Sequence, residues 1–182
     1  MSQGRAKEGI ATYLSPLGPM LLKCEGQRLS GLWFKDAKYA PPWPGETSQT
    51  GRLPVFEQTM KWLDWYFAGE NPVDMPPLAM RGSDFRLAVW AVLQSIPYGQ
   101  LRTYGEIAKE LEQKLGRPMS AQAVGGAVGH NPLSILVPCH RVVGADGNLT
   151  GYAGGLDKKI ALLKLEKADL RSLYAPSSGT VL

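Results

Sequence analysis

The sequence contains few of the residues from which disulfide frameworks and metal sites are built. It has 182 residues but only two cysteines and two histidines. Two cysteines do not make the disulfide network of a small secreted protein, so both thiols are expected to be reduced. The side chains that could bind a transition metal are Cys24, His130, Cys139 and His140. Because their spacing fits no zinc motif, we expect no metal site.

Long apolar segments are also missing. No run approaches the roughly 20 residues that a membrane-spanning helix needs. The first ten residues, MSQGRAKEGI, have no apolar core of the kind that marks a signal peptide. We therefore expect no membrane partner and a cytoplasmic protein, or a nuclear one if the source is a eukaryote.

Acidic residues are not in excess, and the charge is unevenly placed. The formal net charge is +4. Residues 1–80 carry eight basic and eight acidic side chains, whereas residues 81–182 carry twelve and eight. A mildly basic second half permits binding to nucleic acid, but a basic protein without a polyanionic partner would have the same charge.

The first 80 residues have the pattern of a small α/β domain. Residues 10–35 alternate in the manner of strands, and apolar residues recur at helical spacing from Pro54 to Phe67. A polar, proline-containing stretch follows and is the best linker candidate, so we place a domain boundary near residue 80. Its prolines are Pro72, Pro76 and Pro77.

Residues 81–171 have the pattern of a mainly helical domain. Side chains that commonly cap helices stand before apolar residues at helical spacing, namely Ser83, Thr103 and Ser120. Thr103 and Glu106 also fit a capping box. Two helices joined by a tight, glycine-containing turn suggest a helix-turn-helix, and we expect a winged-helix-like arrangement. We expect residues 172–182 to form a flexible tail.

The expected helix at residues 121–129, AQAVGGAVG, is made almost entirely of small residues. Its three glycines each disfavour a helix by roughly 1 kcal/mol relative to alanine, so another surface must fit closely against it. That surface is either a neighbouring helix or a narrow groove such as the DNA minor groove.

Residues 135–143, ILVPCHRVV, form a strand-like apolar run that contains adjacent cysteine and histidine residues. The dipeptide Asp146-Gly147 after it is typical of a hairpin turn. A nearby imidazole can take the proton of a thiol and leave a reactive thiolate. Neighbours in an extended chain point to opposite faces, so Cys139 and His140 can cooperate only through a backbone turn or a bridging water. A buried structural cysteine is the common alternative.

The surroundings of Cys139 resemble the active-site signature of O6-alkylguanine-DNA alkyltransferases, also called methylated-DNA–protein-cysteine methyltransferases. The resemblance rests on Asn131-Pro132 followed by the segment Val137–Val143. Further segments that resemble the family in the same order are residues 96–99, 103–108, 123–127, 151–156 and 162–166. The resemblance covers about residues 83–167, and the first 80 residues match only loosely, as the family's small α/β domain.

The resemblance implies a stoichiometric, single-turnover repair reaction on double-stranded DNA that carries O6-alkylguanine, with O4-alkylthymine as a further candidate. It implies that Cys139 accepts the alkyl group and that His140 acts as its base through a water. Glu166 would orient the imidazole, and Asn131 would hold the turn that presents the cysteine. Other residues that it implies in binding substrate or DNA are Tyr104, Gln122, Ala123, Gly125, Arg141, Val142, Tyr152 and Ala153. We expect a monomer that needs no cofactor.

Two departures from the family pattern bear on DNA and substrate binding. The family usually has an arginine where this chain has Gln122, which predicts weaker DNA binding or weaker flipping of the target nucleotide. Ser134 stands where some members have proline, which predicts a roomier pocket. The main alternative function is a non-catalytic helix-turn-helix protein, such as an alkyltransferase-like protein, but the silent version would lack the acceptor thiol of Cys139. A thiol hydrolase would need a histidine separated from the cysteine in sequence.

Overall fold

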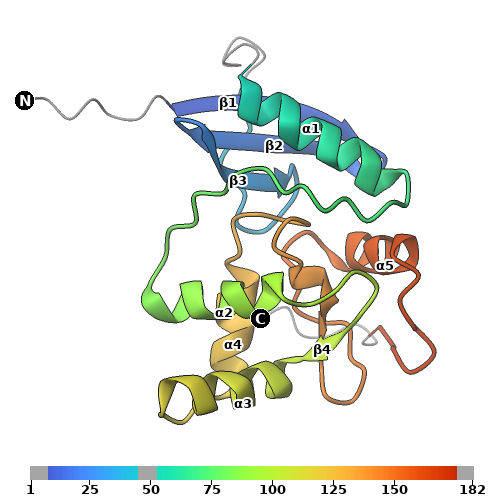
Figure 1. The fold of residues 1–182 in the computed structure, drawn as a ribbon. Helices are drawn as coiled ribbons and strands as arrows, with labels where there is room; N and C mark the ends of the chain where they lie inside the picture. The colour runs from blue at the N-terminus through green and yellow to red at the C-terminus, as the bar shows by residue number, and fades with distance from the viewer. Residues whose placement is uncertain (1–7, 45–52, 176–182) are drawn as a thin grey trace, which may run out of the picture. The chain divides into compact units, whose positions relative to one another are not determined.

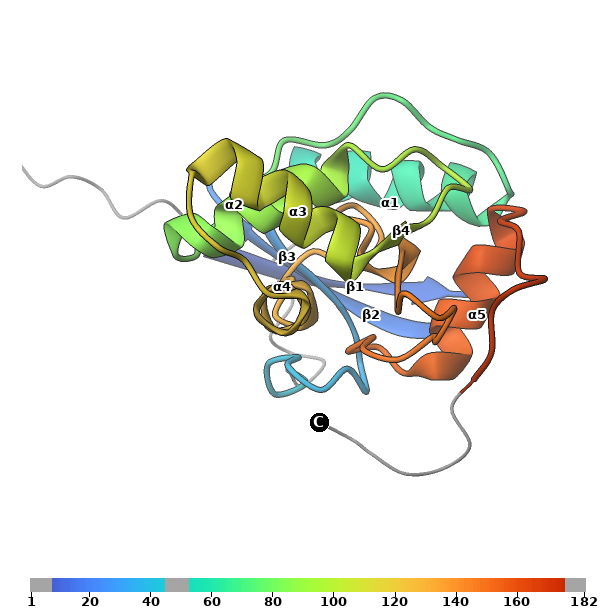
Figure 2. The same ribbon diagram turned by 90° about the horizontal axis from the view of Figure 1, so that it is seen from below.

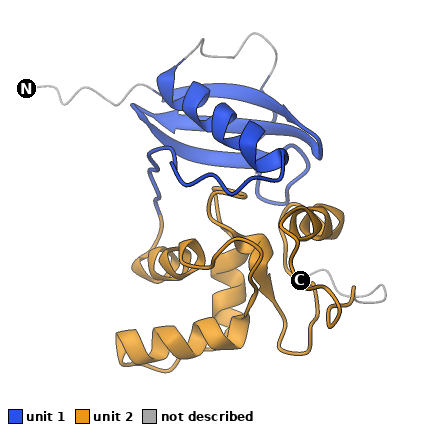
Figure 3. Cartoon of the chain, turned by 45° about the vertical axis from the view of Figure 1, so that its right-hand side comes forward, with its two compact units in different colours: residues 1–81 blue, residues 82–182 orange. Residues whose placement is uncertain are grey.

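The computed structural model of this chain describes residues 8–44 and 53–175. The chain divides into two compact units, residues 1–81 and residues 82–182 (Figure 3). The first unit is a small α/β domain and the second is mainly helical, which confirms the fold class expected from the sequence. No helix of the described residues is long and apolar enough to cross a membrane.

The first unit is a three-stranded antiparallel sheet with a helix on one face (Figure 1). Its strands follow one another as β1 (Glu8–Ser15), β2 (Gly18–Glu25) and β3 (Arg28–Phe34). Helix α1 (Pro54–Phe67) begins with a proline at its first turn, where the missing N–H is not needed. The central strand β2 is buried at three consecutive positions, Met20, Leu21 and Leu22, whereas the first residues of β1 alternate between buried and more exposed positions.

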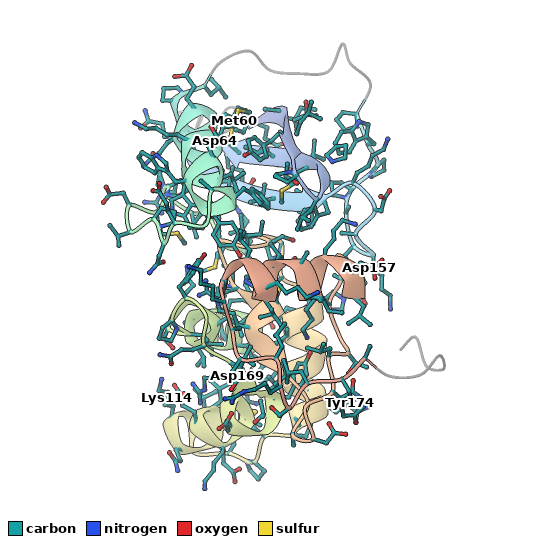
Figure 4. All side chains as sticks on the ribbon, turned by 90° about the vertical axis from the view of Figure 1, so that its right-hand side faces the viewer. Met60, Asp64, Lys114, Asp157, Asp169 and Tyr174 are labelled. Atoms are coloured by element: carbon teal, nitrogen blue, oxygen red, sulfur yellow. The ribbon has the colours of Figure 1, made fainter. Side chains whose placement is uncertain are left out.

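A polar contact ties α1 to the sheet at its edge strand. The Tyr13 hydroxyl on β1 donates a hydrogen bond of 2.7 Å to the Asp64 carboxylate on α1. Figure 4 labels Asp64 and Met60 on this helix. Tyr13 also stacks against Phe67, with ring centroids 6.4 Å apart. The contacts fix the rotation of α1 so that its apolar side faces the strands.

The second unit contains the three helices expected from the capping residues, and these are α2 (Asp84–Gln94), α3 (Tyr104–Leu115) and α4 (Ala121–Gly129). A further helix, α5 (Leu156–Leu165), begins after Gly155 without a side-chain cap. The Ser83 and Ser120 hydroxyls accept hydrogen bonds from backbone N–H groups in the first turns of α2 and α4. The capping box of Thr103 and Glu106 is present at the start of α3. These local predictions are confirmed.

Helix α4 packs across α2 and α3 to form the helix-turn-helix. It runs across both helices in Figure 1 and is seen end-on in Figure 2. The buried Trp90 indole on α2 donates a 2.9 Å hydrogen bond to the Ala127 carbonyl of α4. The glycines of α4 differ in their surroundings. A Cβ at Gly125 would lie 3.8 Å from the Tyr104 ring, whereas a Cβ at Gly126 would meet open space.

The strand predicted at residues 135–143 is mostly wrong. Only β5 (Val142–Val143) is a strand, and it pairs in parallel with β4 (Arg102–Thr103). The preceding residues form tight turns because the Asn131 side chain occupies backbone groups that a ladder would use. Asp146-Gly147 does lie in a turn, closed by a 2.8 Å bond from Gly144 N–H to the Asn148 carbonyl, but it does not join two strands of a hairpin.

The first residues of the tail predicted at 172–182 make backbone hydrogen bonds to the loop before α5. Leu149 N–H donates to the Tyr174 carbonyl, and Tyr174 N–H donates to the Gly147 carbonyl, both at 3.1 Å. Two backbone hydrogen bonds therefore hold this segment against a preceding loop. The rest of the predicted tail, residues 176–182, lies outside the described residues.

Candidate active site

Cys139 opens a short 3-10 helix, Cys139–Arg141, that leads directly into β5. The thiol is almost fully buried, with 5% of the residue exposed. The Asn131 side-chain amide donates to its sulfur at 3.1 Å. The 3-10 helix supplies the backbone turn that Cys139 and His140 need if their side chains are to serve one site.

The segment before Cys139 is held in an irregular path by Asn131. Its amide nitrogen donates to the Val137 carbonyl at 2.7 Å, and its oxygen accepts from Leu133 N–H at 3.0 Å. Ile135 has a φ of 70°, which is uncommon for a β-branched residue. Such strain persists only where the surroundings fix the backbone, and it is frequent at functional sites. This geometry agrees with the turn-holding role expected of Asn131.

Glu166, the C-cap residue of α5, accepts hydrogen bonds from three residues in two other parts of the second unit. Its Oε1 lies 2.6 Å from His140 Nε2. The Arg141 guanidinium donates to both carboxylate oxygens, at 2.8 and 3.0 Å. Gly99 N–H donates to Oε2 at 3.0 Å. The side chains of His140 and Glu166 are fully buried, so this cluster is a closed polar network.

The contact with Glu166 assigns the tautomer of His140. A carboxylate only accepts, so Nε2 carries the proton and Nδ1 holds the free electron pair of the neutral imidazole. Burial lowers the pKa of His140, against the opposing effect of Glu166. A neutral imidazole with a basic Nδ1 is the form that can take a proton from a thiol.

Two pKa shifts in the network work in opposite directions. Burial raises the pKa of the Cys139 thiol, while the Asn131 hydrogen bond and the Lys159 charge act against this rise. Burial also acts to raise the pKa of Glu166, but His140 and Arg141 outweigh it and hold that pKa well below its usual range. The Glu166 contribution to stability is therefore present above the unfolded pKa of about 4.3 and is lost as the pH falls towards the folded value.

Lys159 is a site residue that the sequence did not suggest. It is fully buried, and its ammonium donates to the Val142 carbonyl at 2.6 Å and to the Thr150 carbonyl at 3.0 Å. Burial lowers its pKa to about 8, and the Cys139 thiolate favours its charged form. The available signal was its spacing, because Lys159 falls on the same side of α5 as Leu162, Leu163 and Glu166.

Two tyrosines lie beside the thiol. Burial and the charge of Cys139 raise the pKa of Tyr104 to about 12 and raise that of Tyr152 well above its usual value, so both are neutral phenols. The Tyr104 hydroxyl donates to the Thr150 carbonyl at 3.1 Å. Tyr152 meets the His140 ring edge-on, with centroids 6.4 Å apart. A Cβ at Gly151 would lie 2.4 Å from the Tyr104 hydroxyl, and its φ is +89°, so only glycine fits there.

The residues predicted to bind DNA or substrate divide into exposed and buried groups. Gln122 and Ala123 are exposed on the first turns of α4, and Ala153 is half-buried in the loop before α5. Val142 is buried, and its carbonyl already accepts a hydrogen bond from Lys159.

Arg141 does not lie where a DNA-binding residue would. Its side chain is 11% exposed, and besides Glu166 it donates to the Ile96 carbonyl at 2.6 Å. The Glu166 carboxylate draws the guanidinium inwards, because an unpaired buried carboxylate would be very costly. These contacts favour a positioning role for Arg141, and its part in binding DNA stays a prediction.

Two known protein families match this chain, one in each of its two units. The family described as "6-O-methylguanine DNA methyltransferase, DNA binding domain" matches residues 84–168. The one described as "6-O-methylguanine DNA methyltransferase, ribonuclease-like domain" matches residues 10–78. The chain belongs to the 6-O-methylguanine DNA methyltransferase family. The resemblance stated from the sequence motifs is confirmed.

Individual members of the methyltransferase family are similar over most of their length. The methylated-DNA–protein-cysteine methyltransferase of Mycobacterium tuberculosis (strain ATCC 25618 / H37Rv) is 46% identical over 157 residues, which cover 86% of this chain and 91% of the relative. The relative of the same name from Methanosarcina acetivorans is 44% identical, with 86% and 96% covered. A crystal structure of Mycobacterium tuberculosis OGT in complex with DNA superposes with a TM-score of 0.74, at 45% identity and 87% and 92% coverage.

The site is suited to nucleophilic chemistry by a thiol. Within residues 8–44 and 53–175, no group of three or more His, Cys, Asp or Glu side chains could hold a metal ion. Cys24, the other cysteine, is buried in β2 of the first unit. A buried thiol next to a neutral imidazole and a fixed carboxylate is an arrangement that can supply a nucleophile, a base and an orienting group. The assignment of these roles to Cys139, His140 and Glu166 stays a prediction.

The positioning role of Arg141 predicts a large loss of stability on its removal. Arg141→Met should lower the free energy of unfolding by about 3 kcal/mol or more, because it leaves a buried carboxylate without its cation. Chemical denaturation measures this loss. The double variant Arg141→Met/Glu166→Gln should recover part of it, since no unpaired charge remains. A variant with full stability but reduced DNA affinity would show that Arg141 contacts DNA.

Proposed function

We propose that this methyltransferase removes the alkyl group from O6-alkylguanine in DNA by transferring it to Cys139, once per chain. The observation that carries the proposal is the position of the Cys139 thiol. It receives a hydrogen bond from Asn131 and adjoins His140, whose imidazole is fixed by Glu166. Membership of the family supports the same reaction. The DNA complex of a similar structure supports DNA as the partner.

The transfer is a displacement at the alkyl carbon. The thiol proton passes to His140 Nδ1, directly or through a water, and the sulfur forms a bond to the alkyl carbon. The bond between that carbon and O6 breaks, and its electron pair stays on guanine, which leaves as the neutral base after taking up a proton. A thioether is stable, so the reaction consumes one protein molecule for each lesion.

The buried groups around the thiol favour this direction of charge movement. The Lys159 ammonium and the Asn131 amide both stabilise a thiolate at Cys139. Tyr104 and Tyr152 are neutral, so neither opposes the thiolate with a charge of its own. Tyr104 could pass a proton towards the departing guanine only if its hydrogen bond to Thr150 opened or was shared.

DNA reaches this site through α4. Gln122 and Ala123 are exposed, and Gly126 leaves open space on the helix, so a backbone of another molecule can approach closely. A guanine inside a duplex is out of reach of a buried thiol, and the target nucleotide must therefore be flipped out of the stack. Nothing in this scheme requires a second subunit, and we expect a monomer to act on the lesion.

The main alternative is an alkyltransferase-like protein that binds lesions without repairing them. The presence of a thiol with a base and a positioning network favours transfer. Intact mass after incubation with O6-methylguanine DNA or with O6-benzylguanine separates the two functions, because only transfer adds mass to the protein.

Cys139 should be the sole acceptor. After reaction with O6-benzylguanine, peptide mapping should find one benzyl group, on Cys139 and not on Cys24, which lies buried in a strand with no histidine network. The Cys139→Ala variant should gain no mass. Alkylation of Cys24 in that variant at the wild-type rate would overturn the assignment.

His140 should contribute to the chemical step and not to DNA affinity. We expect His140→Ala to slow transfer from free O6-benzylguanine by about 10²–10⁴-fold, the usual range for a general base. Binding to duplex DNA should change little. His130→Ala is the matched control, because His130 lies at the end of α4 with its ring nitrogen 2.7 Å from the Gly126 carbonyl, and its variant should react normally with the free base. Equal rates in both variants would contradict the assignment of His140 as the base.

Gln122 should limit DNA affinity. The variant Gln122→Arg adds a cation to the exposed face of α4, and should speed repair of duplex DNA and steepen its dependence on salt by about one phosphate contact. The rate with free O6-benzylguanine should not change. Gln58→Arg places the same charge on an exposed position of α1 and is the control. An arginine at 122 that gives no gain on duplex DNA would mean that another group assists flipping, with Arg117 the nearest basic candidate.

A further inference from the structure

The segment after α5, residues 168–174, forms a strand-like contact with the loop of residues 144–155, which precedes that helix. Tyr174 and Asn148 make a parallel bridge. It comprises the hydrogen bonds from Leu149 N–H to the Tyr174 carbonyl and from Tyr174 N–H to the Gly147 carbonyl, both 3.1 Å long. Figure 4 labels Tyr174 and Asp169 on this segment. We call residues 168–174 the C-terminal segment and residues 144–155 the substrate loop.

The shapes of the two segments are matched at Gly147. Gly147 has a φ of +87°, and a Cβ there would lie 2.1 Å from the Ser172 carbonyl oxygen. The Tyr174 hydroxyl donates to the Asp146 carboxylate. The other carboxylate oxygen of Asp146 accepts from Asn148 N–H at 3.1 Å. Side-chain and backbone contacts thus fix the same turn of the substrate loop from its outer side.

The contact also has an apolar part. Val143, Leu149 and Leu163 form a small buried cluster in the second unit. Hydrophobic residues packed against the cluster from the C-terminal segment are Ala168, Leu170 and Leu173. Burial of these side chains opposes release of the segment into water, which two exposed hydrogen bonds alone would not prevent.

The substrate loop leads from this contact to the buried thiol. Thr150 N–H donates to the Asn148 side chain at 3.0 Å. The Thr150 carbonyl accepts from both the Tyr104 hydroxyl and the Lys159 ammonium. Tyr152, two residues further on, packs beside His140. The C-terminal segment fixes Asn148, and Thr150 and Tyr152 follow it within four residues. A fixed Asn148 therefore helps to hold Thr150 and Tyr152 in place at the active site.

We infer that the C-terminal segment is a positioning element of the active site, holding the substrate loop closed so that Thr150 and Tyr152 are in place when an alkylated guanine binds. This inference rests on the proposed function of Cys139. Tyr174 and Leu173 are its positioning residues, and they act on the site only through the loop. Releasing the segment weakens substrate binding, and at the same time makes Cys139 more accessible to small reagents that react only slowly while the loop is closed.

Two variants of the full chain test the inference. Tyr174→Phe removes the hydrogen bond to Asp146, and Leu173→Asp removes the apolar contact. Arg171→Ala is the matched control, because Arg171 lies in the same segment and its side chain pairs with the exposed Asp169 rather than with the substrate loop. Each protein is assayed for saturation kinetics with free O6-benzylguanine and for carbamidomethylation of Cys139 by iodoacetamide.

We expect the half-saturating concentration of O6-benzylguanine to rise about threefold in Tyr174→Phe and about tenfold in Leu173→Asp, with limiting rates within about twofold of wild type. The rate of Cys139 carbamidomethylation should rise in the same order. Labelling of the buried Cys24 reports unfolding that extends to the first unit, and circular dichroism of each variant reports loss of the helices of the second. If Leu173→Asp labels Cys24 as well, Tyr174→Phe alone decides.

Different results would overturn the proposed function and the positioning role of the C-terminal segment. Wild-type protein that reacts with iodoacetamide but never with O6-benzylguanine would refute the proposed function, while the iodoacetamide rates would still test the positioning role. Wild-type protein that reacts with both reagents, with Tyr174→Phe and Leu173→Asp indistinguishable from Arg171→Ala, would overturn the inference.

Discussion

The buried carboxylate of Glu166 is the interaction on which the rest of the second unit depends. It accepts hydrogen bonds from His140, Arg141 and Gly99 N–H, and so joins the end of α5 to the 3-10 helix and to the turn after α2. An ionised carboxylate away from water is tolerated only with such partners. Movement of the end of α5, the 3-10 helix or the turn after α2 would remove hydrogen bonds from the Glu166 carboxylate. The free-energy cost of a poorly paired buried charge therefore keeps the site rigid.

That rigidity is necessary because the chain that carries the thiol has little regular structure. Residues 131–138 form neither a helix nor a regular strand. The Asn131 side chain and tight turns set the path of their backbone. Side-chain hydrogen bonds replace the ladder that would hold a strand. Ile135 adopts a strained φ in the backbone path that places Cys139 at the start of a 3-10 helix. There the Cys139 sulfur accepts a hydrogen bond from Asn131, and His140 is the next residue.

The second unit separates chemistry from DNA contact. The proton-accepting and orienting groups, His140 and Glu166, are fully buried, whereas the proposed DNA-facing residues of α4 are exposed and uncharged. Tyr104 connects the two regions, since its ring lies near Gly125 and its hydroxyl reaches the Thr150 carbonyl of the substrate loop. Substitutions on α4 can therefore change DNA affinity without altering the charge balance at the thiol, which is the basis for comparing duplex and free-base substrates.

The sequence by itself determined the features that depend on neighbours within about four residues. These are the capped helices α2, α3 and α4, the α/β character of the first unit, and the motif around Cys139 that identified the family. Only the tertiary structure decided the direction of Arg141, the burial of Lys159 and the attachment of Tyr174 to Gly147. The strand predicted at residues 135–143 failed for a more local reason, because the Asn131 side chain takes backbone groups that a ladder would use. For Arg141, Lys159 and Tyr174 the deciding partner is a carboxylate or backbone carbonyl distant in sequence, and its demand for a hydrogen bond cannot be read from local residue patterns.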